Sequence, residues 1–346
     1  MPPSWQRTRQ NRRVTSTRAV NTACTWLRFS FVEHLNKPRS SKSRILAILT
    51  HSPRRTRVVF VALYLVLFSW SARRFGVPVD RIAVTGWILA AFAFANVGRP
   101  WRAQRDMLRD WSIFAGMLFA YEYSRGLADQ LGRPVTFTLL RDIDRAIFFG
   151  VDPNVWLQHR LNISSTLAWY EYPLAVTYMT HFIFPPGVAV VLWWVSRTEW
   201  VRYVRRLTIL FFLSVITYVA IPAAPPWMAA RDGYLEPVQR ITARGWSKMG
   251  LHTVSKVFDR GAAISNPVAA LPSLHAACAL LVVAFFWKRI PRLLRPVSLV
   301  FPAAMALCLV YFGEHWVIDV VLGWLYVGAA FWLAARWETR RLPRRA

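Results

Sequence analysis

Two histidines and one aspartate in the last quarter of the chain have the types and spacing of a catalytic group. His275 follows Pro272 and Ser273, and His315 precedes Asp319 by four positions. Pro and Ser favour the start of a helix, so we expect His275 in a first helical turn. On a helix, residues four apart share a face, so the Asp319 carboxylate would lie against the His315 imidazole. Taken alone, His275 is more typical of a histidine anchored at a membrane interface than of a catalytic one.

Two imidazoles and one carboxylate suit phosphoryl transfer. A neutral imidazole can attack phosphorus while its carboxylate partner offsets the positive charge that develops. A second, protonated imidazole can donate to the leaving oxygen. We therefore predict that His315 is the nucleophile, Asp319 its orienting partner and His275 the general acid. A metal site made of the same residues with Glu314 is the alternative; the spacing favours the first interpretation, so neither a metal nor a cofactor is predicted.

Long apolar runs surround these residues. Hydrophobic residues make up 55% of the 346 positions and aromatic residues 15%. Runs close to membrane-spanning length recur from residue 58 onward, and the many Trp and Tyr suit membrane interfaces. We predict an all-α, polytopic membrane helical bundle with about eight spans and its catalytic helices near the C-terminus. The predicted spans are 58–72, 82–97, 111–125, 174–196, 207–222, 271–287, 296–312 and 315–335.

The formal net charge of +27 has a topological explanation. Lys and Arg are retained on the cytoplasmic side, where they meet anionic lipid, so no nucleic-acid partner is predicted. With eight spans, the basic clusters fall on one side with the basic N-terminus, although Arg73 and Arg74 fall on the other. Two crossings separate His275 from His315, which puts both at the extracytoplasmic face of the cell membrane. The clusters are 99–109, 197–206, 288–295 and 336–345.

Composition divides the chain into four parts. Residues 1–56 form a basic, mostly disordered cytoplasmic tail, and residues 337–346 form a second basic tail; both are expected to contact anionic lipids. Residues 57–206 hold the N-terminal spans and an interfacial segment with a short amphipathic helix. Residues 207–336 form the catalytic membrane core.

The motifs around the histidines resemble those of the type 2 phosphatidic acid phosphatase superfamily. Its Pro-Ser-x-His motif is matched by Pro272–His275, and its His-x-x-x-Asp motif after a small residue by Gly313–Asp319. The resemblance is closer to the inositol phosphorylceramide synthase, or inositolphosphotransferase-like, branch, because Ile221–Trp227 reads Ile-Pro-Ala-Ala-Pro-Pro-Trp. It covers roughly residues 207–335. It implies a lipid phosphatase or phosphotransferase that acts on a membrane lipid phosphate, with water or a polyol as acceptor of a phosphohistidine.

The sequence departs from the superfamily in the cation that binds phosphate. The usual Lys-x-x-x-x-x-x-Arg-Pro motif is absent, and Arg99-Pro100 lacks the Lys. We predict substrate contacts from other residues, while a solvated cation or an interhelical histidine stays open for each. These residues are Arg125, Lys256, Arg260, Ser273 and His181, with Arg240, Arg244 and Lys248 as further outer-loop cations.

A non-enzymatic transporter or lipid flippase is the alternative function. It would explain the spans and an intramembrane His and Asp that relay protons. It does not explain two histidines at one membrane level beside helix-capping residues, and no pair of interrupted spans suggests an inverted repeat.

Overall fold

The computed structural model describes residues 53–75, 81–126, 131–161, 168–242, 256 and 268–341. These segments are helical, which confirms the predicted all-α class, and the described residues contain only two isolated β-bridges, Thr136–Ala223 and Ala223–Ala269. Most of the predicted N-terminal tail and the last residues of the C-terminal tail lie outside the described segments. Their predicted contacts with anionic lipid, and the division into four parts, stay predictions.

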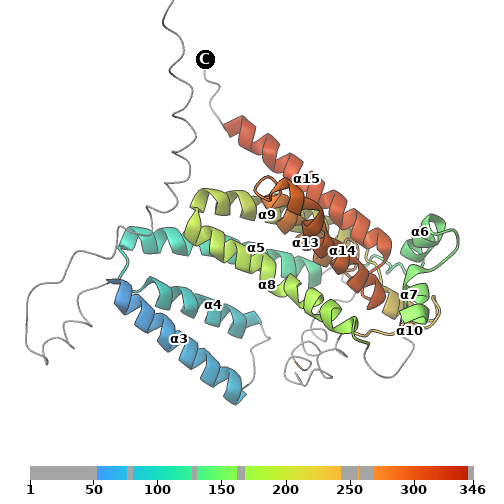
Figure 1. Ribbon diagram of the computed structural model, residues 1–346, viewed down its shortest axis with the longest axis horizontal. Helices are drawn as coiled ribbons and strands as arrows, with labels where there is room; N and C mark the ends of the chain where they lie inside the picture. The colour runs from blue at the N-terminus through green and yellow to red at the C-terminus, as the bar shows by residue number, and fades with distance from the viewer. Residues whose placement is uncertain are drawn as a thin grey trace, which may run out of the picture.

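Long helices make up most of the fold, and three short ones gather at one end (Figure 1). The long helices are α3 (Pro53–Phe75), α4 (Arg81–Asn96), α5 (Trp101–Gly126), α8 (Glu171–Val195), α9 (Arg197–Ala220), α13 (Leu274–Phe286), α14 (Arg295–Tyr311) and α15 (Val317–Arg341). The short ones are α6 (Leu139–Ile147), α7 (Pro153–Leu161) and α10 (Pro226–Arg231), and the 3₁₀ turn η1 (Arg292–Leu294) precedes α14.

Every predicted span overlaps one of these eight helices, but not all of the helices are long and apolar enough to cross a membrane. Five segments of the described chain are long and apolar enough: Thr56–Phe75, Glu171–Val195, Arg197–Ala220, Arg292–Tyr311 and Val317–Arg340. Helices α4 and α13 are apolar but, with 16 and 13 residues, are shorter than these five segments. The first half of α5 is rich in charged residues. The number of crossings, predicted as about eight, therefore stays a prediction.

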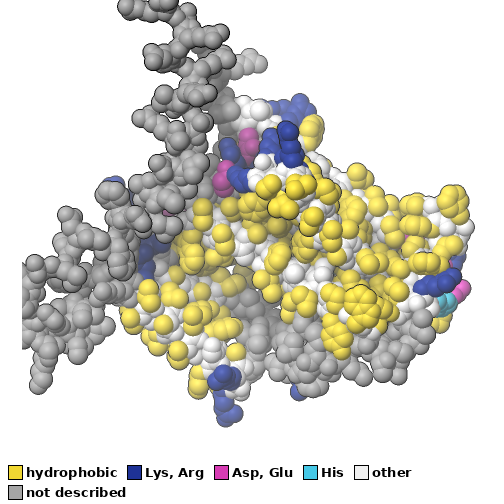
Figure 2. Space-filling view, viewed as in Figure 1, with side chains coloured by type: hydrophobic (Ala, Val, Ile, Leu, Met, Phe, Trp, Pro, Cys, Tyr) yellow, Lys and Arg dark blue, Asp and Glu magenta, His cyan; other side chains and the backbone are white. Residues whose placement is uncertain are grey.

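Helix α13 lies at the centre of the bundle and packs against α8, α9, α14 and α15. Its 13 residues are almost all apolar, and Ala276, Ala277 and Leu281 are fully buried. The outer helices leave many large apolar side chains exposed, Trp194 and Ile216 among them. Hydrophobic side chains cover much of the face shown in Figure 2. Such a surface is unfavourable in water and suits contact with lipid.

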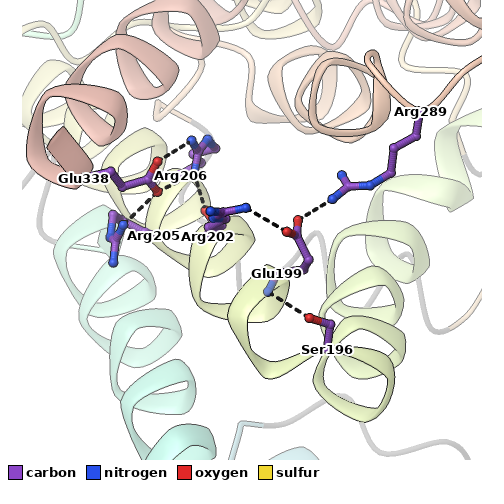
Figure 3. A network of polar contacts seen from close by, with 7 residues as sticks. All are labelled: Ser196, Glu199, Arg202, Arg205, Arg206, Arg289 and Glu338. Atoms are coloured by element: carbon purple, nitrogen blue, oxygen red, sulfur yellow. Dashed lines mark hydrogen bonds and ion pairs between the residues drawn. The ribbon is translucent and has the colours of Figure 1, made fainter. Parts of the chain in front are cut away.

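Ion pairs close one end of the bundle (Figure 3). Arg205 and Arg206 of α9 donate to Glu338 near the end of α15, at 2.7 and 3.0 Å. Arg289, which follows α13, donates to Glu199 at 2.6 Å. The basic segments at 197–206, 288–295 and 336–341 thus meet at one end, as the topology argument requires. The side of the membrane that this end faces stays a prediction.

The backbones of α13 and α15 approach closely at Gly323. A Cβ atom built at Gly323 would lie 2.6 Å from the backbone oxygen of Ser273 and 3.4 Å from Cβ of Ala277. Any larger residue must push the start of α13 away from α15. Gly328, further along α15, has no atom within 4 Å of an added Cβ.

We predict that Gly323→Ala separates the two helices and lowers the free energy of unfolding by about 1–3 kcal/mol. Gly328→Ala is the matched control, and alanine should there stabilise the exposed helix by up to about 1 kcal/mol. Thermal unfolding in detergent, followed by tryptophan fluorescence, measures both. Equal melting temperatures for the two variants would contradict the close packing.

Candidate active site

The first turn of α13 holds His275. Ser273 is the N-cap, with extended backbone at φ −73° and ψ 107°, and its hydroxyl oxygen accepts from the N–H of Ala276 at 3.4 Å. This confirms the helix start that Pro272 and Ser273 predict. Ser273 is fully buried, and its predicted contact with substrate stays a prediction.

A tight turn places His315 just before α15. Gly313 has φ +72°, a left-handed conformation that favours glycine, and an added Cβ would lie 2.8 Å from Cγ1 of Val238. Oδ2 of Asp319 accepts from the N–H of Trp316 at 2.9 Å and lies 3.2 Å from Nδ1 of His315. Asp319 is fully buried, and the contact leaves Nε2 as the nitrogen of His315 that is available for chemistry.

The two helix starts bring the three residues together. The N–H of Ser273 donates to the carbonyl of Asp319 at 2.9 Å, which joins α13 to α15 at their N-terminal ends. The ring centroids of His275 and His315 lie 5.7 Å apart. The start of α13, with the positive end of its helix dipole, favours an anion beside His275. The arrangement can therefore hold a phosphate between two imidazoles.

Helix α8 covers the other face of His275. The ring of His181 lies 3.9 Å from that of His275, centroid to centroid, and the ring of Tyr178 lies 4.9 Å away, stacked at 20°. The structure thus places His181, predicted as a substrate contact, directly against the predicted general acid. Side-chain contacts thus lead from His181 to His275 and on to His315, which contacts Asp319.

Among the described cations, Arg240 lies beside the His315 turn. Its guanidinium donates to both carboxylate oxygens of Glu314, at 2.7 and 3.2 Å, and stacks 5.0 Å from the ring of Trp227. Thr242 also donates to Glu314. The N–H of Trp227 donates to the carbonyl of Gly313 at 3.1 Å, so the Pro-Pro-Trp element supports the turn. The Glu314 carboxylate is engaged by Arg240 and Thr242, which weakens the alternative of a metal site that includes it.

The other predicted cations are less well placed or not described. Lys256 is exposed, and Arg260 lies outside the described segments. Arg125 belongs to the last turn of α5, and its side chain is not described. The predicted contacts of all three with substrate stay predictions.

Helix α7 supplies supports that the sequence analysis missed. The side-chain amide of Asn154 donates to the carbonyls of Val310 and His315, at 2.8 and 3.0 Å. The amide of Gln158 donates to the carbonyls of Tyr311 and Gln239, at 2.9 and 2.8 Å. Both residues are buried, so this part of the predicted interfacial segment supports the His315 turn. We call Asn154 and Gln158 together the brace. Two amides four apart on one helix face were the available signal, but solvated polar residues have the same spacing.

We predict that Asn154→Ala lowers the free energy of unfolding by about 1–3 kcal/mol, because it removes two hydrogen bonds to backbone carbonyls in a buried place. Asn154→Asp should cost more, since a carboxylate of the same size would face two carbonyl oxygens. Trp156→Ala, on the exposed face of α7, is the control and should cost less than about 1 kcal/mol. Chemical denaturation in mixed micelles measures the three. An Asn154→Asp protein as stable as the unmodified one would contradict the brace.

Comparisons with known proteins agree with these motifs. A sequence profile described as PAP2 superfamily matches residues 138–333, more than half of the chain. Phosphoinositol dihydroceramide synthase of Bacteroides thetaiotaomicron is 25% identical over 293 residues, which cover 78% of this chain and 87% of that protein. No solved structure gives a significant match. The profile begins at the start of α6, so it includes the brace that the predicted range of 207–335 left out. The chain therefore belongs to the PAP2 superfamily, the type 2 phosphatidic acid phosphatases, and resembles its inositol phosphorylceramide synthase branch.

Proposed function

We propose that this membrane protein transfers a phosphoryl group from a lipid phosphoester through a phosphohistidine on His315. The observation that carries the proposal is the His315–Asp319 pair, which faces His275 at the adjoining start of α13. Membership of the superfamily supports a lipid phosphoester-modifying enzyme over a transporter or flippase. Neither of those alternatives needs an imidazole–carboxylate pair opposite a second imidazole.

The first step exchanges a P–O bond for a P–N bond. Nε2 of His315 attacks phosphorus, and the bond to the leaving alcohol breaks. His275, protonated, donates its proton to that alcohol oxygen. Asp319 holds Nδ1 of His315 and offsets the positive charge of the phosphorylated ring.

The second step returns His315 to its starting state. The hydroxyl of the acceptor gives its proton to His275 and attacks phosphorus, and the P–N bond breaks. Water as acceptor makes the enzyme a lipid phosphatase. A polyol such as inositol as acceptor makes it a phosphotransferase. The name of the Bacteroides relative suggests a different partition, in which inositol stays on phosphorus and a phosphoinositol group moves to the hydroxyl of a dihydroceramide-type lipid.

Phosphate oxygens need positive charge during both steps. The N-terminus of α13 supplies part of it. We propose that a cation from the outer segments supplies the rest, with Arg125, Lys256 and Arg260 as the predicted residues and Arg240 as an additional one. His181, packed on the ring of His275, would help to fix the orientation of the general acid.

We propose that the site faces the extracytoplasmic side of the membrane. The basic end of the bundle, with Arg205, Arg206 and Arg289, is the end that the positive-inside rule assigns to the cytoplasm. Glu338, at that end, is 19 residues from Asp319 along α15, which corresponds to about 30 Å on a helix. The two ends therefore lie on opposite membrane faces.

Activity of single variants tests the mechanism. Purified protein in nanodiscs is given phosphatidic acid or phosphatidylinositol, with and without inositol, and lipid products are measured by mass spectrometry. His315→Ala and His275→Ala should each lower turnover about 100-fold or more, and Asp319→Asn should cause a comparable loss. His159→Ala, an exposed histidine on α7, is the control and should retain full turnover. Undiminished turnover by His315→Ala would sink the proposed mechanism.

The same experiment separates the two acceptors. A phosphatase releases free phosphate or phosphoalcohol at the same rate with and without inositol. A phosphotransferase forms a new phosphoester that appears only with the acceptor. Acid-labile label on the unmodified protein, absent from His315→Ala, would support the covalent intermediate.

A further inference from the structure

A second carboxylate caps the helix that carries Asp319. Asp144, in the short helix α6, is fully buried. Its Oδ2 accepts from the N–H of Val317 at 2.8 Å, and its Oδ1 accepts from the N–H of Ile318 at 2.9 Å. The cap of α15 thus comes from a residue more than 170 positions earlier in the chain.

These two bonds complete the start of α15. The first N–H groups of a helix have no partner within it and are usually satisfied by a side chain just before the first turn. Here Asp319 accepts from Trp316, and Asp144 accepts from the next two residues. Every N–H between His315 and Asp319 is therefore held by a carboxylate. The backbone that sets the distance between the two catalytic side chains has little freedom left.

The charge of Asp144 acts on the same place. Burial raises its pKa to about 6, the two N–H bonds oppose that rise, and the charges of Asp319 and Asp152 add to it. Asp152, just before α7, is itself paired with Arg145 of α6, at 2.7 Å. The Arg145 charge therefore offsets the negative charge that Asp152 places near Asp144. Asp319 in turn contacts His315. Ionised Asp144 therefore adds a negative charge at the start of α15, near the His315–Asp319 pair. This charge favours a positive charge on the imidazole ring of His315.

We propose that Asp144 is a positioning residue for His315, which fixes the first turn of α15 and, when ionised, stabilises the charged form of the His315–Asp319 pair. The inference rests on the proposed role of His315 as nucleophile. A neutral residue could cap the helix, but the side chain of Asn offers one acceptor oxygen where two N–H groups point at Asp144. Two acceptors and a negative charge are both supplied only by a carboxylate of this length.

Asp144→Asn tests the charge, and Asp142→Asn is its matched control. Asp142 lies on the same helix, is half exposed and pairs with Arg141, so the same charge change is made away from α15. In nanodiscs at pH 7.5, Asp144→Asn should lower kcat about tenfold or more, with the KM of the lipid donor changed less than about threefold. At pH 5, below the raised pKa of about 6, we expect Asp144 to lose most of its charge in the unmodified protein, so the two should differ by less than about threefold. Asp142→Asn should keep kcat within about twofold at both values of pH.

Hydrogen–deuterium exchange gives a readout that does not depend on turnover. Peptides that contain Val317 and Ile318 should exchange faster in Asp144→Ala than in the unmodified protein, and in Asp144→Asn to an intermediate degree. Asp142→Asn should leave the exchange of these peptides unchanged.

The outcomes separate this inference from the proposed function. Equal kcat and equal exchange in Asp144→Asn and Asp142→Asn would overturn it. So would an activity loss in Asp144→Asn that is the same at pH 5 and pH 7.5, because the contact would then act on folding alone. If His315→Ala keeps its activity while the exchange at 317–318 responds to Asp144, the cap exists and the proposed function fails instead.

Discussion

The site depends on one backbone hydrogen bond, from the N–H of Ser273 to the carbonyl of Asp319. That bond sets the starts of α13 and α15 at the same level and brings His275 and His315 to one place. It forms because Gly323 has no side chain to keep the helices apart. The first turn of α13 then positions His275. His315 lies in the turn before α15, which Asn154 and Asp144 hold from two other helices.

The two ends of the bundle are stabilised by different physical means. At the basic end, Arg–Glu pairs are partly exposed and contribute little each, but they join α9, α13 and α15. At the end that holds His275 and His315, polar side chains are buried, so the loss of any one of their hydrogen bonds is costly. Asn154, Gln158 and Asp144 hold backbone groups of one short stretch, 310–318. We therefore expect substitutions of polar residues to cost less stability at the basic end than at the end that holds residues 310–318.

Local spacing in the sequence predicted how His275, His315 and Asp319 lie. The residues that surround them are held by long-range contacts, which local spacing does not predict. The Pro-Ser pair located the first turn of α13, and the i, i+4 spacing of His315 and Asp319 put their side chains together. Asn154 bonds to carbonyls more than 150 positions away, which no periodicity can reveal. The same limit hid the pairing of Arg240 with Glu314. Hydrophobic runs located every long helix but overestimated α13, because its apolar run includes residues that stay outside the helix.

The shortness of α13 has a consequence for the backbone that precedes it. Thirteen helical residues rise about 20 Å, roughly 10 Å less than the hydrocarbon thickness of a bilayer. The described chain just before the helix, residues 268–273, is irregular backbone, which is tolerated within a membrane only where protein surrounds it. Leu271 and Ser273 are buried, and the hydroxyl of Tyr218 donates to the carbonyl of Pro272 at 3.0 Å. Because α13 begins only at Leu274, the irregular backbone just before His275 is enclosed by the protein, and the Pro272 carbonyl finds its partner inside the bundle.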